Sequence, residues 1–290
     1  MAGVRVGGQP GENPTVLIGT IFYEGHKIVS DPVKGLFDRG KAEELVSCQD
    51  ELSDETGNPC MLDVVGRTAE ALKKYVEFAS EATDSPILVD SPLAEARLEA
   101  CKHAVEVGLG ERIVYNSINP EASREEIEKI RDIGLKAAIV LAFSEYEFEP
   151  EDKMRILQGN DGLIAKAEKA GIEKVLVDLS VLDVASIAYT AASIQMVKEK
   201  LGLPSGCSPA NAFDTWRKAG EFKPQVKRAC LAALNVFVRC FGADFILYGP
   251  VEAADTVFPS CAAADAILTY SLVTGGYEVK DKNTPLYKIL

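Results

Sequence analysis

Four short apolar segments of this sequence end on a polar side chain that can accept or exchange hydrogen bonds. Asp63, Asp90 and Asp178 each end such a segment, and Asn116 ends a fourth. A continuous apolar run of about four to eight residues is typical of a strand buried on both faces. In a barrel of parallel strands, the carboxyl ends of the strands meet at one rim, where ligands bind. The sequence therefore predicts one polar site assembled from distant parts of the chain.

The same rim is predicted to carry further hydroxyl and amide side chains close to the strand ends. These are Ser91, Ser117, Ser208 and Asn211. Several aspartates without histidines suit a flat heterocycle rich in donors, because a carboxylate accepts two parallel N–H groups, such as the 2-amino and N3–H edge of a pterin. Each such bond contributes about 1.5–3 kcal/mol when it is shielded from water. An oxygen-only Mg²⁺ site is a competing use of the same carboxylates, and spacing alone does not separate the two.

Local structural roles compete with a shared site for each of these residues. An aspartate that follows a strand often caps the next helix, which would account for any one of the three taken alone. Asn116 opens the turn-rich segment 116–120, and Asn211 could cap the helix that contains Trp216. In the first loop after a strand, His26 and Lys27 are candidates for contacting an anionic tail of a ligand.

Apolar and amphipathic segments alternate along the whole chain. Strands are predicted at 15–23, 60–65, 86–90, 112–116, 137–143, 175–178, 203–208 and 244–248. Helical patterns occupy 31–52, 67–80, 92–107, 120–132, 162–170, 184–201, 211–241 (with a break near Pro224) and 251–273. The polar segment 144–158 is predicted to be a lid or partner-contact loop, and 275–290 a tail packed on the outside. This alternation predicts an α/β fold, a (β/α)₈ TIM barrel, as a single domain over residues 1–290. The rival open doubly wound sheet would normally have a Gly-rich turn after its first strand, which this chain lacks.

Composition excludes several classes of function. A formal net charge of −13 argues against nucleic acid as a partner, because phosphate binding needs a basic surface. The amino terminus does not resemble a signal peptide, and no apolar run is long enough to span a bilayer. The apolar stretch 257–273 contains Pro259 and Asp265 and is better interpreted as a buried helix. We therefore expect a cytoplasmic protein without membrane insertion.

The cysteines and histidines give little support for a disulfide framework or a transition-metal site. Seven cysteines are widely spaced without a C-x-x-C pair, and the sequence has only two histidines. Metal hydrolases built on barrels usually use several histidine ligands. We expect no metal in this chain.

Several segments taken together resemble a known family. They are Gly7–Leu17, Phe22-Tyr23, His26–Val29, Asn116–Asn119, Ala137–Phe143 and Leu247–Pro250. In order along nearly the whole chain, they are similar to the H subunit of tetrahydromethanopterin S-methyltransferase. The family also has soluble bacterial members that act with tetrahydrofolate in the demethylation of glycine betaine and related methylated amines. The chain looks more like those members, because it begins close to the Gly-Gly-Gln-Pro-Gly-Glu block.

The resemblance implies a pterin-binding barrel and assigns roles to several rim residues. By similarity to methyltetrahydrofolate:corrinoid methyltransferases, the pterin ring would be bound by Asp90-Ser91, Asn116-Ser117 and Asp178, and Asp63 is added as a further rim carboxylate. The amide that lies close to N5 in that family is best matched by Asn211, with Ser208 as the second choice. Asn211 and Asp178 are thus the expected catalytic residues.

The implied reaction is methyl transfer between a methylated corrinoid protein and N5 of tetrahydrofolate. The cobalamin would be carried by the partner protein, and the chain would form a homodimer. Three alternatives stay open: a tetrahydromethanopterin-using subunit of a membrane-associated complex, a Mg²⁺-dependent lyase or hydrolase, and a non-catalytic binding subunit.

Overall fold

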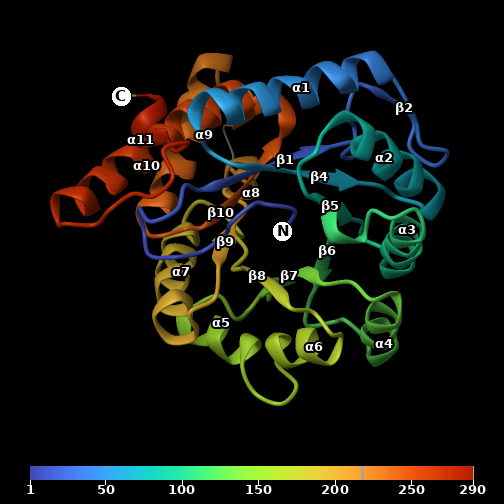
Figure 1. Cartoon of the computed structure of the whole chain (residues 1–290). Coiled ribbons are helices and arrows are strands. Elements are labelled where there is room, and N and C mark those ends of the chain that lie inside the picture. Colours follow the sequence, from blue (N-terminus) through green and yellow to red (C-terminus); the bar gives the residue numbers. More distant parts are fainter. Residues whose placement is uncertain (217–218, 290) are drawn as a thin grey trace.

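Parallel strands close into a barrel in the computed structural model, which describes residues 1–216 and 219–289. The strand order around the barrel is β1-β10-β9-β8-β7-β6-β5-β4, and every neighbouring pair is parallel. Helices surround these strands on the outside (Figure 1). The predicted (β/α)₈ barrel is confirmed, because eight strands in sequence order close through the pairing of β1 with β10.

The observed elements follow the predicted alternation. The barrel strands are β1 (Val16–Ile21), β4 (Cys60–Val65), β5 (Ile87–Asp90), β6 (Ile113–Ile118), β7 (Ala137–Leu141), β8 (Lys174–Asp178), β9 (Ser205–Cys207) and β10 (Phe245–Pro250). The helices are α1 (Arg39–Thr56), α2 (Ala69–Ala82), α3 (Ala94–Glu106), α4 (Arg124–Ile133), α5 (Pro150–Leu157), α6 (Leu163–Lys169), α7 (Ile187–Leu201), α8 (Ala210–Asp214), α9 (Pro224–Cys240), α10 (Ala254–Thr274) and α11 (Pro285–Lys288). Short 3₁₀ turns, η1 (Gly110–Arg112), η2 (Ala219–Glu221) and η3 (Val251–Ala253), complete the set.

The prediction of helix from residue 31 was wrong over its first turns. Residues 29–37 form a small antiparallel hairpin of β2 (Val29–Asp31) and β3 (Leu36–Phe37). The turn before β3 contains Gly35 with φ of +64°, where an added Cβ would lie 2.7 Å from Ala71 Cα. Only glycine fits this backbone comfortably. The helix α1 begins after Asp38, whose carboxylate accepts a hydrogen bond from the Lys41 amide at 3.2 Å.

The segment 144–158 was predicted to be a loop, yet its second half is the helix α5. Pro150 occupies the first turn of α5, and Glu149 and Asp152 form a capping box around its start. Met154 and Leu157 are buried, so they anchor α5 to the barrel. The high content of acidic residues made this segment look like a loop, although acidic residues in the first turn favour a helix.

The inside of the barrel is filled by a compact set of apolar side chains, separate from the larger core between strands and helices. It consists of Val16, Ile18, Met61, Leu88, Val114, Ala137, Ile139, Leu176, Phe245 and Leu247. Successive strand residues alternate between the two faces, so these positions fix which later residues on each strand also point inward.

The last long helical segment, Val251–Thr274, is long and apolar enough to cross a membrane by length and composition alone. In this structure 44% of its apolar window is buried inside the protein. Its Asp265 is fully buried and forms an ion pair with Arg239 of α9. These contacts are those of the last outer helix of the barrel.

Candidate active site at the carboxyl end of the barrel

A layer rich in polar side chains lies directly above the apolar filling of the barrel, toward the carboxyl ends of the strands. Its members each follow a residue of the interior set by two positions, and alternation therefore points them inward. They are Thr20, Asp63, Asp90, Asn116, Leu141, Asp178 and Gly249. The three aspartates and the asparagine predicted from the strand ends thus belong to one layer of the barrel interior.

Asp63 lies at the centre of a hydrogen-bonded group inside the barrel. Its side chain is 3% exposed. Oδ1 accepts a hydrogen bond from Asn116 Nδ2 at 3.1 Å, and Oδ2 accepts one from Thr20 Oγ1 at 3.0 Å. Because β5 separates β4 from β6, the bond between Asp63 and Asn116 spans the barrel interior. Burial raises the pKa of Asp63 to about 6, against the opposing effect of these two bonds.

Asp90 occupies the neighbouring strand and is half-buried. Burial raises its pKa well above the usual range, and repulsion from the carboxylates of Asp63 and Asp178 adds to the effect. The Arg97 guanidinium and the Ser91 amide act in the opposite direction. Within residues 1–216 and 219–289, no side chain donates a hydrogen bond to the Asp90 carboxylate. Asp90 can therefore accept hydrogen bonds from a ligand without giving up a side-chain partner.

Asp178 faces the same interior from β8. Its side chain is 7% exposed, and Oδ1 accepts a hydrogen bond from the Ser180 amide at 2.8 Å. Burial raises the pKa of Asp178 to about 6, while the Ser180 amide and the Lys153 ammonium lower it and Asp63 raises it. The negative charges of Asp63 and Asp178 disfavour ionisation of Asp90, and that of Asp63 disfavours ionisation of Asp178, as expected for neighbours in one layer of the barrel.

Asn116 and Ser117 are both buried, at 9% and 8% exposure, and a cis peptide bond joins them. The pairing register with β7 shifts between Asn116 and Ile118. The Asn116 amide is committed to Asp63 through its nitrogen, which leaves its oxygen as the atom that can accept from a ligand.

Ser91 is buried and takes part in the turn after β5. Its hydroxyl accepts a hydrogen bond from the Leu93 amide at 3.2 Å, and its carbonyl accepts one from the Arg97 guanidinium. Arg97 also pairs with Glu126 at 3.0 Å, and the Tyr115 hydroxyl donates to the same carboxylate at 2.6 Å. This buried cluster lies behind β5 and β6 and fixes the loop that follows Asp90.

Ser208 and Asn211 lie together beyond the end of β9. Their Oγ and Oδ1 atoms are 3.4 Å apart, and the Asn211 side chain is exposed on the first turn of α8. In the part of the chain that the structure describes, neither forms a hydrogen bond with the inward aspartates. The predicted catalytic role of Asn211 stays a prediction.

His26 is not available to a ligand tail, contrary to the expectation from sequence. The ring is 3% exposed, and its Nδ1 accepts a hydrogen bond from the Phe22 amide at 3.1 Å. Its Nε2 lies 3.0 Å from Glu252 Oε1, to which the Tyr23 hydroxyl also donates at 3.1 Å. The ring therefore links the loop after β1 to η3. Lys27 remains exposed.

Sequence reasoning missed two side chains that contact this site. Thr20 is the second-last residue of β1, after an apolar run, as Asp63 follows the apolar start of β4. A search for polar residues near the ends of apolar strands could therefore have found it. Lys153 gave no such signal, because it lies in the segment predicted to be a loop. Among the described residues, no group of three or more His, Cys, Asp or Glu side chains is arranged to hold a metal ion.

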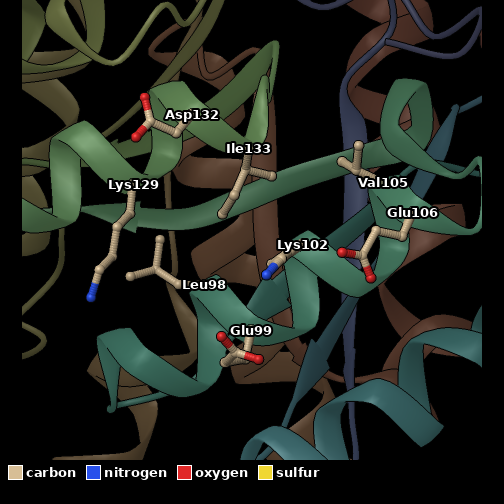
Figure 2. A pocket seen from close by; sticks show the side chains of 8 residues that line it. All are labelled: Leu98, Glu99, Lys102, Val105, Glu106, Lys129, Asp132 and Ile133. Atoms are coloured by element: carbon tan, nitrogen blue, oxygen red, sulfur yellow. The ribbon is translucent and has the colours of Figure 1, made fainter.

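The outer surface has a hollow that lies away from the barrel mouth. A groove of about 420 Å³ runs between α3 and α4, as Figure 2 shows. The aliphatic side chains Leu98, Val105 and Ile133 line it, and charged residues of both signs surround them. None of the predicted site residues lines this groove.

The fold and the carboxyl end of the barrel define a class of protein: a TIM barrel closed by parallel strands, with acidic and amide side chains at the carboxyl end. The chain belongs to the family described as the MtrH subunit of tetrahydromethanopterin S-methyltransferase, whose family model matches residues 1–279. It is therefore an enzyme of a methyltransferase family.

Curated relatives match over almost their full length. The chain is 42% identical over 304 residues to the H subunit of tetrahydromethanopterin S-methyltransferase from Methanopyrus kandleri, covering 98% of this chain and 94% of that protein. It is 40% identical over 299 residues to the protein of the same name from Methanothermobacter marburgensis, covering 100% and 96%. The H subunit of a putative mtx methyltransferase from Methanosarcina mazei is 39% identical over 277 residues, covering 92% and 89%.

Solved structures with the same architecture are more distant in sequence. A Yersinia pestis dihydropteroate synthase bound to a pterine-sulfa conjugate has a TM-score of 0.61 at 14% identity, covering 89% of this chain and 95% of that one. A Coxiella burnetii dihydropteroate synthase in complex with pteroic acid has a TM-score of 0.61 at 15% identity, covering 89% and 93%. At these identities the likeness concerns the fold.

Proposed function

We propose that this enzyme transfers a methyl group between a methylated corrinoid protein and N5 of a tetrahydropterin bound at the barrel mouth. The observation that supports the proposal most is the single inward layer holding Asp63, Asp90, Asn116 and Asp178. A reduced pterin offers N–H donors along one edge, and carboxylates held inside a barrel accept them strongly. The predicted pterin-binding set is completed by Ser91, Ser117 and Ser208.

The residues have distinct parts in this proposal. Asp90 has no side-chain donor in the described structure, so it is free to accept from the pterin. Asp178 is fixed by the Ser180 amide through one oxygen, and its other oxygen can accept a second ligand N–H. Asp63 is already bonded to Thr20 and Asn116, and it orients the Asn116 oxygen toward the ligand. Ser91 fixes the loop after Asp90.

For this transfer the chain has to position the pterin N5 and control its protonation. When the methyl group moves to the pterin, the N5–carbon bond would form, the cobalt–carbon bond of the partner's corrinoid would break with its electron pair kept by cobalt, and the proton of N5 would pass to solvent water. The corrinoid of the partner supplies the reactive methyl group. Alignment of N5 against it can contribute up to about 7–11 kcal/mol in well-oriented intramolecular models. Asn211 is our candidate for the amide that follows the charge at N5.

Tetrahydrofolate is our first candidate for the pterin and tetrahydromethanopterin the second. The second is supported by the names of the curated relatives, which state tetrahydromethanopterin S-methyltransferase. Both molecules present the same pterin edge to the carboxylates, so the mouth described above suits either. Their tails differ, and a direct comparison of affinities separates them.

Calorimetric titration of the purified protein with each tetrahydropterin tests ligand binding. We expect binding by the wild type and a loss in Asp178→Asn of about 10- to 100-fold, since a charge-assisted hydrogen bond contributes about 1.5–3 kcal/mol. Asp161→Asn is the matched control, because its carboxylate is fully exposed on the outside and its loss should leave the affinity unchanged. Absence of binding for both tetrahydropterins would sink the proposed function.

Single-turnover transfer with a purified methylated corrinoid protein tests the reaction. If Asn211 acts at N5, then Asn211→Ala lowers the transfer rate far more than the pterin affinity. Equal losses in the two quantities would restrict Asn211 to binding. No transfer by a wild type that binds the pterin would leave the chain as a binding subunit only.

We also propose a cytoplasmic homodimer that associates with the corrinoid protein. Exposed apolar side chains on α9 and α10 support self-association, notably Phe237, Ile267 and Tyr270 at 37%, 70% and 58% exposure. Light scattering of the wild type and of Ile267→Glu measures the assembly state. A wild-type monomer, or a dimer that Ile267→Glu leaves intact, would contradict this surface. Co-purification with integral membrane proteins would instead favour the membrane-associated alternative.

A further inference from the structure

Lys153 is buried at a place where neither the fold nor the reaction obviously needs a cation. It is carried by α5, and its side chain is 1% exposed. Its Nζ donates to the Ala142 carbonyl at 2.5 Å and to Ser180 Oγ at 2.6 Å. An ammonium has three donors, and removing it from water is costly unless a charge compensates. A neutral side chain could pack in the same space without this cost.

The contacts of Lys153 lead directly to Asp178. The Ser180 hydroxyl accepts a hydrogen bond from the Lys153 ammonium, and the Ser180 amide donates one to Asp178 Oδ1 at 2.8 Å. The backbone of Ser180 has φ of +46°, a conformation that residues other than glycine rarely adopt. The Thr190 hydroxyl donates a hydrogen bond to the Ser180 carbonyl at 2.7 Å, and the Ser180 hydroxyl donates one to the Ala142 carbonyl at 3.1 Å. Lys153 therefore supports the turn that aims the Asp178 carboxylate.

The charges around this pair have a consistent arrangement. Lys153 favours the ionised form of Asp178, whereas the carboxylate of Asp63 opposes it. The preceding residue of its own helix, Asp152, also carries a negative charge that favours the charged form of Lys153. Burial lowers the pKa of Lys153 to about 8, while Asp178 and Asp152 oppose that shift. Lys153 is thus the cation that acts on Asp178 in this acidic layer, as Arg97 acts on Asp90.

We propose that Lys153 is a positioning residue that fixes the direction and the negative charge of Asp178 without touching the ligand. The proposal rests on the proposed pterin binding. Its consequence is a specific pH dependence: the affinity for a tetrahydropterin falls at acidic pH as Asp178 takes up a proton, and Lys153 sets where that fall occurs. A lysine that only fastened two loops together would not set this midpoint.

The test is the pH profile of tetrahydrofolate affinity for Lys153→Met between pH 5 and 9, or of tetrahydromethanopterin affinity if that is the pterin that binds. We expect the midpoint of the affinity loss to move to higher pH by about one unit, which is about a fivefold loss of affinity at the wild-type midpoint and about a tenfold loss well below it. Toward pH 9 the variant should approach the wild-type affinity. Lys166→Met is the matched control. Lys166 also donates to loop carbonyls, those of Pro120 at 2.7 Å and Ala122 at 3.0 Å, but it does not act on Asp178. Its midpoint should stay at the wild-type value.

A second variant, Lys153→Arg, tests the same proposal in case Lys153→Met does not fold. Lys153→Arg keeps a charge that does not titrate below pH 12, so its affinity should keep the wild-type acidic midpoint. Toward pH 9 Asp178 is ionised whether or not residue 153 carries a charge, so the wild type, Lys153→Arg and Lys153→Met should bind the tetrahydropterin with similar affinity there. An unmoved midpoint in folded Lys153→Met would overturn the proposal, as would a midpoint in Lys153→Arg that moves to higher pH although the charge is kept. A wild type that binds no pterin would refute the proposed function instead.

Discussion

The two ends of the barrel treat buried carboxylates in opposite ways. At the amino end, Asp265 accepts from the Thr15 amide at 2.9 Å, from Asn58 Nδ2 at 2.6 Å, and from the Arg239 guanidinium. At the carboxyl end, Asp63, Asp90 and Asp178 face one another, and Lys153 reaches only one of them through a serine. Asp265, Asp63 and Asp178 are all buried, so burial alone does not explain the difference.

The difference supports our proposal that the carboxyl end binds the ligand. A carboxylate that is paired with an arginine and accepts several hydrogen bonds has no lone pair left for a ligand. Its role is to stabilise the barrel. Carboxylates that repel one another store an electrostatic cost, which a ligand with N–H donors can relieve. Binding sites commonly carry such costs and give up stability for function. The comparison makes quantitative predictions for both ends.

The largest expected effect is at the amino end. Arg239→Met leaves Asp265 as an uncompensated buried charge, which should lower the free energy of unfolding by about 3–5 kcal/mol. Urea unfolding at neutral pH measures it. Arg228→Met is the control, because its pair with Asp255 at 3.2 Å is exposed and should contribute at most about 1 kcal/mol. Similar losses of unfolding free energy in both variants would show that the buried ion pair contributes no more to stability than the exposed one.

The second effect is at the carboxyl end and concerns the ligand. Asp178→Asn should weaken tetrahydropterin binding by about 1.5–3 kcal/mol, as stated above, without a comparable loss of stability. Calorimetry and thermal unfolding on the same samples separate the two quantities. A large drop in melting temperature with unchanged affinity would mean that Asp178 stabilises the fold, as Asp265 does, and does not bind the ligand.

The third effect is the pH dependence of ligand affinity in the wild type. The pKa values of Asp63 and Asp178 are about 6, so both carboxylates are ionised above that pH; Asp178 then accepts from the ligand in our proposal, and Asp63 holds the Asn116 amide. As pH falls through about 6 they take up protons and lose this capacity, and affinity should fall by up to about tenfold per pH unit for each proton. Titrations from pH 5 to 8 measure it. A profile in Asp178→Asn as steep as that of the wild type would exclude Asp178 as the titrating group.

The smallest effect is a gain in stability. Because the pKa of Asp90 is raised in the folded protein, the folded state binds its proton more tightly than the unfolded state does. Stability therefore falls as pH rises from the unfolded pKa through the folded one, and above both values ionised Asp90 is destabilising. Asp90→Asn should raise the melting temperature at pH 8 and weaken pterin binding. Asp161→Asn should change neither, and a lower melting temperature for Asp90→Asn would contradict this account.

Much of the site was predictable because strand ends are encoded locally. Asp90 and Asp178 end apolar strands, and the closed barrel brings such ends to one rim. Asp63 looked less secure, because Val64 and Val65 continue its strand, but alternation turns Asp63 inward and Val64 outward. The hairpin at residues 29–37 and the helix α5 were missed, since Gly35 acts through contact with α2 and α5 is held by two buried side chains.

The sequence by itself determined the alternation of strands and helices, and with it the barrel and the identity of the carboxylates at its mouth. Those features follow from residue periodicity and from the residue type at each strand end, both of which are local. Only the tertiary structure decided which carboxylates share a site, that Asn116 binds Asp63 across β5, and that Lys153 lies behind Asp178. Such contacts join residues far apart in the chain, and their electrostatics depend on burial that exists only after the barrel has closed.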